Sequence, residues 1–202
     1  MVIYIRLRQL AIRLSKLNPH PHCDVLLEQY ATEGNLAAEW LSIMDGIEGC
    51  KVADLGAGNG ILGIGANLLG AEKVWLIECD EEVVKTAEKN CQEFPQVEVL
   101  LHQITDGLPL EIEPQTIIMN PPWGTQKKAA DRPFLLAAMR SSANLIHLMH
   151  SGKSTHIAAM AEDEGWSAEV RMEAEFRLPA KYSHHTSRSS TTAVKCWRLW
   201  RR

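Results

Sequence analysis

The most chemically specific stretch of this chain is Asn120-Pro121-Pro122-Trp123, which follows the apolar run 116–119. The apolar run predicts a buried strand. The prolines predict a rigid turn after it, because proline fixes φ and disfavours helical geometry in the preceding residue. At the carboxyl end of a strand, the carbonyl groups of Asn120 and Pro121 would face the edge of a planar ring lying on Trp123. This arrangement of residues 120–123, called the shelf below, suits the binding of an exocyclic amino group. The alternative is an ordinary turn with a buried tryptophan.

A strand, a glycine turn and a helix are predicted upstream, over residues 50–69. Gly56, Gly58 and Gly60 lie in the turn, where the lack of a Cβ lets the backbone approach a ligand. The N-terminus of the following helix offers N–H groups that have no partner within the helix. This pattern predicts a nucleotide site.

The spacing distinguishes between nucleotide cofactors. A dinucleotide fingerprint requires Gly or Ala where this chain has Ile61, and the lysine of a phosphate loop is absent. Asp54 lies at the strand tip, where its charge would repel a pyrophosphate and attract the cationic amino-acid moiety of S-adenosylmethionine. The next strand ends at Glu78 and Asp80, and an acid at that place typically binds ribose hydroxyls. We therefore expect S-adenosylmethionine rather than NAD.

The composition is that of an ordinary globular chain. Of the 202 residues, 46% are hydrophobic, and no apolar run reaches membrane-spanning length, so no membrane association is expected. The five cysteines show no C-x-x-C pair, which favours a reducing, cytoplasmic setting over disulfides or zinc. We expect one domain, 1–202, with N-terminal helices in 1–45, a cofactor-binding core in 46–150 and a C-terminal helix and β-hairpin in 151–202.

Basic residues are concentrated at the two ends of a chain whose net charge is −4. Residues 177–202 contain seven Lys and Arg and no acid, and residues 1–23 contain Arg6, Arg8, Arg13 and Lys16 and no acid. A basic arm on an acidic body binds polyanions locally. Lys127, Lys128 and Arg132 form a further basic loop after the shelf. The alternative is charge that serves solubility alone.

Hydrophobic periodicity predicts the elements that position these groups. Alternating strands and helices predict a doubly wound, mostly parallel α/β sheet, and two alternating runs near the C-terminus predict an antiparallel hairpin with a loop at 183–192. The predicted strands are 50–55, 73–79, 97–101, 116–119, 145–149, 168–178 and 192–200, and the predicted helices are 5–17, 33–44 with Thr32 as its N-cap, 61–69, 80–94, 133–144 and 155–164.

Two pairs of histidines raise the question of a metal. His20 and His22 lie in a Pro-rich break, and His147 and His150 flank the fifth predicted strand. Neither pair shows a third ligand, so we expect core or surface histidines and no metal site.

In combination, the shelf and the glycine turn resemble the motifs of class I S-adenosylmethionine-dependent methyltransferases of the N6-adenine type. Their order and their separation, about sixty residues, are typical of that class. Nearly the whole chain is similar to the methyltransferase-like protein five family, which methylates an adenine of small-subunit ribosomal RNA. Segments 27–32, 118–125 and 178–182 with His185 carry this closer resemblance, since the first and last are not general methyltransferase motifs.

The resemblance implies a Rossmann-like, seven-stranded sheet whose last strand is antiparallel, with ribosomal RNA as substrate. Related families act with a small zinc-binding activator protein. The residues expected to hold the target amine are Asn120, Pro121, Pro122 and Trp123. The expected cofactor contacts are Gln29, Thr32, Asp54, Gly56, Gly58, Asn59, Gly60, Ile61, Glu78, Cys79, Asp80, Gln103, Ile104 and Asn120, and the expected RNA contacts are Lys127, Lys128, Arg132, Lys181, His185 and Arg188.

Two residues depart from the family pattern. Trp123 replaces the usual Phe or Tyr, which puts the depth of the target pocket in question, and Gln103 replaces an acid expected on the cofactor adenine, with Asp106 as an alternative. The same shelf serves DNA adenine and protein glutamine N5 methylation, although neither a target-recognition domain nor an N-terminal helical domain is visible. A catalytically silent, cofactor-binding RNA or ribosome-assembly protein is the alternative from another class.

Overall fold

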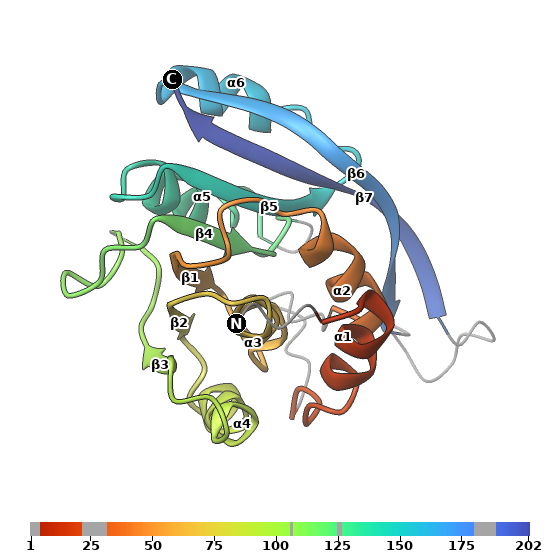
Figure 1. Cartoon of the computed structure of the whole chain (residues 1–202). Helices are drawn as coiled ribbons and strands as arrows, with labels where there is room; N and C mark the ends of the chain where they lie inside the picture. The colour runs from red at the N-terminus through yellow and green to blue at the C-terminus, as the bar shows by residue number, and fades with distance from the viewer. Residues whose placement is uncertain (1–4, 22–31, 106, 125–126, 180–188) are drawn as a thin grey trace.

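The computed structural model describes residues 5–21, 32–105, 107–124, 127–179 and 189–202. Seven strands form one sheet in the order β3-β2-β1-β4-β5-β7-β6 (Figure 1). The strands are β1 (Lys51–Leu55), β2 (Lys73–Glu78), β3 (Val97–Leu101), β4 (Thr116–Met119), β5 (Leu145–Ser151), β6 (Trp166–Pro179) and β7 (Ser189–Arg201). The helices are α1 (Leu7–Leu14), α2 (Gly34–Ser42), α3 (Ile61–Leu68), α4 (Glu81–Cys91), α5 (Arg132–Met139) and α6 (Ile157–Asp163).

The strand pairing confirms the predicted α/β sheet and its C-terminal hairpin. β1 pairs in parallel with β2 and β4, and β4 pairs in parallel with β5. β7 runs antiparallel to β5 and to β6. The strand order reverses direction between β1 and β4, and open α/β sheets bind ligands outside the carboxyl ends of the strands at such a switch point.

Both faces of the central strands are buried under helices. Successive side chains of a strand point to opposite faces, so Val52 of β1 packs in the core beneath α1, α2 and α3, and Ala53 packs beneath α5 and α6. Figure 1 shows α1, α2 and α3 gathered on one side of the sheet. Because both faces are covered, the central strands are almost continuously apolar.

Tertiary contacts shift two of the predicted bounds. The helix expected to run to residue 144 ends at Met139, where the Ser141 hydroxyl donates to the carbonyl of Ala138 at 2.7 Å. The loop predicted through residue 192 is wrong for residues 189–192, which belong to β7 and pair with β6 beside the buried Phe176. Within the described ranges, no helix combines the length and the apolar character needed to cross a bilayer.

Candidate active site

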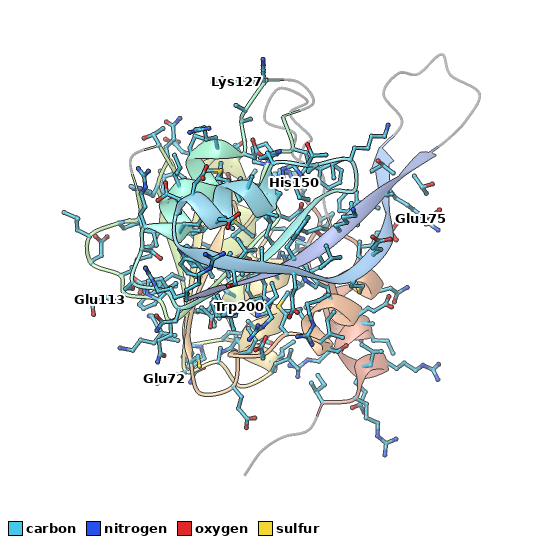
Figure 2. All side chains as sticks on the ribbon, turned by 90° about the horizontal axis from the view of Figure 1, so that it is seen from above. Glu72, Glu113, Lys127, His150, Glu175 and Trp200 are labelled. Carbon is cyan, nitrogen blue, oxygen red and sulfur yellow. The ribbon has the colours of Figure 1, made fainter. Side chains whose placement is uncertain are left out.

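A pocket of about 280 Å³ opens at the carboxyl ends of the parallel strands. Figure 2 labels Lys127 and His150 toward this end of the molecule and Glu72 and Glu113 toward the opposite end. The walls combine apolar side chains with a small number of polar groups, as in most small-molecule sites. Among the residues expected around the cofactor, those that line the pocket are Thr32, Gly56, Gly58, Asn59, Ile61, Glu78, Cys79, Gln103, Ile104 and Asn120.

The glycine turn forms one wall of this pocket. Gly56, Gly58 and Gly60 have φ values of 69°, 56° and 87°, in the left-handed region that favours glycine. A Cβ on Gly56 would lie 3.2 Å from Cε1 of Phe134, which also lines the pocket. Gly60 does not line the pocket but precedes α3, and a Cβ there would lie 2.8 Å from Cδ1 of Leu76. The turn therefore needs glycine for both space and backbone geometry.

The carboxylate of Glu78 joins the end of β2 to the glycine turn. Its Oε2 accepts the N–H of Gly58 at 3.0 Å, and its Oε1 accepts the N–H groups of Cys79 at 2.8 Å and Asp80 at 3.1 Å. A carboxylate has lone pairs for further bonds, and Glu78 lines the pocket. Asp80 instead accepts two N–H groups in the first turn of α4 and does not line the pocket. Of the two acids considered for ribose, only Glu78 is in position.

Asp54 lies beneath the glycine turn and does not line the pocket. It is 1% exposed, and its Oδ2 accepts the N–H of Gly63 in the first turn of α3 at 2.8 Å. Burial raises the pKa of Asp54 to about 7; the Gly63 N–H opposes this rise and the charge of Glu78 adds to it. Asp54 therefore does not make the direct contact with a cationic group of the cofactor that the sequence predicted. Its side chain instead supports the glycine turn from inside the protein.

The raised pKa of Asp54 predicts a pH dependence of stability. Between the ordinary value of 3.8 and about 7, the folded protein holds a proton that the unfolded chain has released. The stabilising contribution is complete below 3.8 and is lost as the pH rises through 7, with a slope of up to about 1.4 kcal/mol per pH unit. We expect Asp54→Asn to remove this slope from the free energy of unfolding, measured without cofactor between about pH 5 and 8.

The exposed Asp163 supplies the control for this measurement. Asp163→Asn is expected to leave the pH slope as in the unmodified protein. If Asp54→Asn also leaves it unchanged, the carboxyl group of Asp54 is ionised throughout the measured range.

The side chain of Asn120 follows β4, lines the pocket and is held by two hydrogen bonds. Its Nδ2 donates to the hydroxyl of Thr32 at 3.2 Å, and its Oδ1 accepts the indole N–H of Trp123 at 3.1 Å. An indole nitrogen only donates, so the contact with Trp123 fixes which amide atom is oxygen. The prediction of Thr32 as a helix N-cap is wrong, because Glu33 occupies that position and Thr32 lines the pocket.

The ring of Trp123 packs against the core outside the pocket lining. Its centroid lies 5.2 Å from that of Phe176, edge-on, and 6.4 Å from that of His150. Pro122 lines the pocket, whereas Pro121 and Trp123 do not. Within the shelf, Asn120 and Pro122 therefore face the pocket, whereas Trp123 lies outside its lining.

Three asparagines hold the segment after α1 over the glycine turn. The Oδ1 of Asn90 accepts the backbone N–H of Asn18 at 2.8 Å and its side-chain N–H at 2.9 Å. The Nδ2 of Asn90 donates to the carbonyls of Asn59 at 2.9 Å and Asn18 at 3.1 Å. This network holds the segment that places His20 at the pocket, where Cδ2 of His20 lies 3.7 Å from the position of a Cβ built on Gly58. The sequence analysis considered His20 only with His22 as a metal ligand and did not place it at the pocket, because this placement depends on partners far along the chain.

Replacing Asn90 by alanine is expected to destabilise the fold by about 1–3 kcal/mol and to weaken cofactor binding. Asn90 is 8% exposed, so its loss leaves polar groups of Asn18 and Asn59 without partners and loosens the wall that contains His20. Urea unfolding and calorimetric titration with cofactor measure the two effects. The control is Asn67→Ala on α3, and equal stability of the two variants would contradict the expectation.

The segment between the shelf and α5 closes another side of the pocket. Lys127, Ala129, Ala130 and Phe134 line it. Ala129 has a φ of 60° and is the single non-glycine residue with positive φ among the described residues. Neither alanines in a polar loop nor a helical Phe forms a motif, so sequence reasoning did not single them out.

The expected RNA contacts are only partly within the described ranges. Lys127, Lys128 and Arg132 are exposed, and Figure 2 shows Lys127 at the outer tip of its loop. The other expected contacts of cofactor or RNA, Gln29, Asp106, Lys181, His185 and Arg188, lie outside the described residues.

Basic residues in the described part of the C-terminal hairpin largely contact the chain itself. Arg198 forms a bidentate ion pair with Asp45 at 2.9 and 2.7 Å, and Arg201 donates to the carbonyl of Ala143 at 2.9 Å. Arg177 lies 3.3 Å from Glu33. The described hairpin is therefore a weaker candidate for phosphate binding than the loop at Lys127.

The two histidines of β5 have different surroundings. The Nε2 of His147 lies 2.9 Å from the carbonyl oxygen of Asp45, and burial lowers its pKa. His150 is 1% exposed, and its Nε2 lies 3.0 Å from Oδ2 of Asp131, which His156 also contacts at 2.6 Å. The sequence shows no third ligand beside His147 and His150, but in the fold the start of α5 and the start of α6 bring Asp131 and His156 to His150 at the end of β5.

Comparisons with known proteins connect this site to one family. The family model for ribosomal protein L11 methyltransferase (PrmA) matches residues 32–120. The rRNA N(6)-adenosine-methyltransferase Mettl5 of Drosophila melanogaster is 31% identical over 205 residues, which cover 96% of this chain and 96% of that protein. The chain belongs to the Mettl5 family.

Further similarities agree with membership of the Mettl5 family. The uncharacterized protein MJ0284 of Methanocaldococcus jannaschii is 31% identical over 96% of this chain and 94% of its own length. The crystal structure of PH1948 from Pyrococcus horikoshii, provisionally assigned as an RNA methyltransferase, matches with a TM-score of 0.86 and 34% identity over 97% of this chain and 98% of that one. The Mettl5 resemblance and the class I methyltransferase fold expected from the motifs are confirmed.

Proposed function

We propose that this chain, acting as one methyltransferase domain, transfers a methyl group from S-adenosylmethionine to N6 of an adenine in small-subunit ribosomal RNA. The observation that carries the proposal is the amide of Asn120, held between Thr32 and Trp123 at the pocket. The Drosophila relative, named for N6-adenosine methylation of rRNA, supports the choice of substrate.

The lining of the pocket fits S-adenosylmethionine. Glu78 offers a carboxylate to ribose hydroxyls, Gln103 offers an amide, and Ile104 and Phe134 supply apolar walls for a base. A Cβ on Gly56 would intrude on the space next to Phe134. When bound, the cofactor supplies a methyl group on a sulfonium, which is a strong electrophile.

The residues of the shelf act on the adenine amine. Its lone pair is delocalised into the ring, so it is a weak nucleophile. Asn120 Oδ1 and the carbonyl of Pro121 accept its two N–H bonds, which draws the nitrogen toward tetrahedral geometry and directs its lone pair at the methyl group. Thr32 and Trp123 keep the Asn120 amide in the orientation that this requires. Such positioning of two held partners supplies a large part of the rate.

The adenine must leave its stack to reach the shelf. Trp123 replaces part of the lost stacking, which is worth roughly 1–3 kcal/mol per base. Lys127, Lys128 and Arg132 contact phosphates of the same strand. Proton loss accompanies or follows the transfer, so no strong general base is required. Partial desolvation and the charge of Glu78 raise the pKa of the Cys79 thiol to about 11, which disfavours the nucleophilic thiolate at neutral pH.

Methyl incorporation into ribosomal RNA, duplex DNA and a release factor tests this function directly. We expect incorporation into ribosomal RNA, at an adenine that mapping locates and that is unmethylated in cells without the gene. Incorporation into DNA or the release factor alone would reassign the enzyme to the DNA adenine or glutamine N5 class. Cofactor binding without turnover on any RNA would support a silent ribosome-assembly protein.

We also propose a cytoplasmic location and a small zinc-binding activator protein as partner. Two large apolar side chains that contact solvent support a partner surface: Leu101, 54% exposed at the end of β3, and Leu110, fully exposed in the segment between β3 and β4. Methyltransferase activity measured with and without the co-expressed activator tests this, and equal activity would contradict it.

A further inference from the structure

Asp131, His150 and His156 form a hydrogen-bonded cluster next to the shelf. They come from the start of α5, the end of β5 and the start of α6. Oδ2 of Asp131 lies 3.0 Å from Nε2 of His150 and 2.6 Å from Nε2 of His156. Asp131 and His150 are buried, whereas the side chain of His156 is 49% exposed. One carboxylate oxygen therefore joins three segments of the chain.

The carboxylate of Asp131 does not cap its own helix, α5. Asp131 occupies the N-cap position of α5, where an Asp side chain usually accepts an N–H of the first turn, but it forms no such bond and has helical backbone angles. Burial tends to raise the pKa of Asp131, but the hydrogen bonds from His150 and His156 outweigh it and hold the pKa below its ordinary value. The ionised carboxylate only accepts, so both Nε2 atoms must carry hydrogen.

The geometry favours hydrogen bonding over a metal ion. The Nδ1 of His150 is paired with the hydroxyl of Ser154, so both nitrogens of this ring have protein partners. Two ligands held about 2.0–2.1 Å from a tetrahedral ion are roughly 3.3 Å apart. The 2.6 Å between His156 and Asp131 is shorter than this.

The cluster holds two parts of the site. On one side, the ring of His150 lies 6.4 Å from that of Trp123, whose N–H orients Asn120. On the other, Asp131 ends the segment containing Ala129, which lines the pocket with a φ of 60°. An alanine keeps such a conformation only where the surrounding structure imposes it.

We propose that Asp131, His150 and His156 are positioning residues for methyl transfer, which hold Trp123 and the segment 127–131 in the arrangement that the reaction requires. This inference rests on the proposed function. None of the three lines the pocket, so they act through Trp123 and Ala129. Loss of the cluster should therefore lower the turnover number more than it weakens cofactor binding.

His156 is the most informative position to change, because its exposed ring is not needed for the core. His156→Ala is expected to lower kcat on RNA about 10- to 100-fold at saturating cofactor, as small misplacements do. His156→Gln should recover most of this loss, because an amide N–H still donates to Asp131. Thr155→Ala, at the exposed neighbouring residue, should have the activity of the unmodified enzyme. The cofactor Kd should change less than about threefold in all three variants.

Nitrogen NMR of labelled histidine provides a readout independent of the substrate. Both His150 and His156 should show a protonated Nε2, and Asp131→Asn should shift both signals. Stoichiometric zinc in the purified protein, with Nε2 lacking hydrogen, would overturn the proposal in favour of a metal site. Equal kcat for His156→Ala and Thr155→Ala, or no gain from His156→Gln, would also overturn it. Unmodified protein that methylates no RNA but shows the NMR signals would instead contradict the proposed function.

Discussion

An Asn120→Ala variant is expected to lose methyl transfer to RNA by about 100- to 1,000-fold. In the proposed mechanism, the side-chain oxygen of Asn120 accepts an N–H of the target amine as the lone pair of that amine turns toward the methyl group. Alanine removes this acceptor and leaves Thr32 and Trp123 without their shared partner. Single-turnover transfer of a labelled methyl group to ribosomal RNA measures the effect, and calorimetric titration should show a cofactor Kd within about tenfold of normal.

Two further variants separate the role of the amide from that of its neighbours. Asn144→Ala changes an exposed amide at the opposite end of the strands and should retain full activity. Trp123→Phe keeps a ring for stacking but removes the N–H that orients Asn120, and should lose about three- to tenfold. Full activity of Asn120→Ala would refute the mechanism.

Replacing Glu78 by alanine is expected to weaken cofactor binding by at least about 100-fold. The Glu78 carboxylate accepts the N–H of Gly58 in the glycine turn and also faces the pocket, so one substitution removes a ligand contact and the support of the turn. Hydrogen bonds to a charged group are each worth about 1.5–3 kcal/mol, and two such losses give this factor. Calorimetric titration with S-adenosylmethionine or its demethylated product measures it.

The matched control for Glu78 is Glu81, an exposed acid in the first turn of α4. Glu81→Gln should bind the cofactor normally. Glu78→Gln keeps one acceptor oxygen, so its affinity for the cofactor should lie between that of Glu78→Ala and that of Glu81→Gln. A Glu78→Ala protein with normal cofactor affinity and a lowered unfolding temperature would show that this acid supports only the fold.

Local patterns in the sequence determined the architecture. The continuous apolar strands, the glycine turn at Gly56 and the alternating runs near the C-terminus each carry their own conformational preference, so the sheet and its hairpin could be predicted from residues close together in the chain. Element ends were less predictable. The hairpin strands extend beyond their alternating core because each pairs with the other over its whole length.

The sequence by itself predicted the chemistry proposed for the site, because Asn120-Pro121-Pro122-Trp123 and the glycine turn are local motifs. Only the tertiary structure decided how the other groups are used. Asp54 is buried beneath the turn, and His20 reaches the pocket through an asparagine network. Asp131 and His156 meet His150 next to the shelf. These placements depend on contacts between segments distant in sequence, which no local spacing encodes.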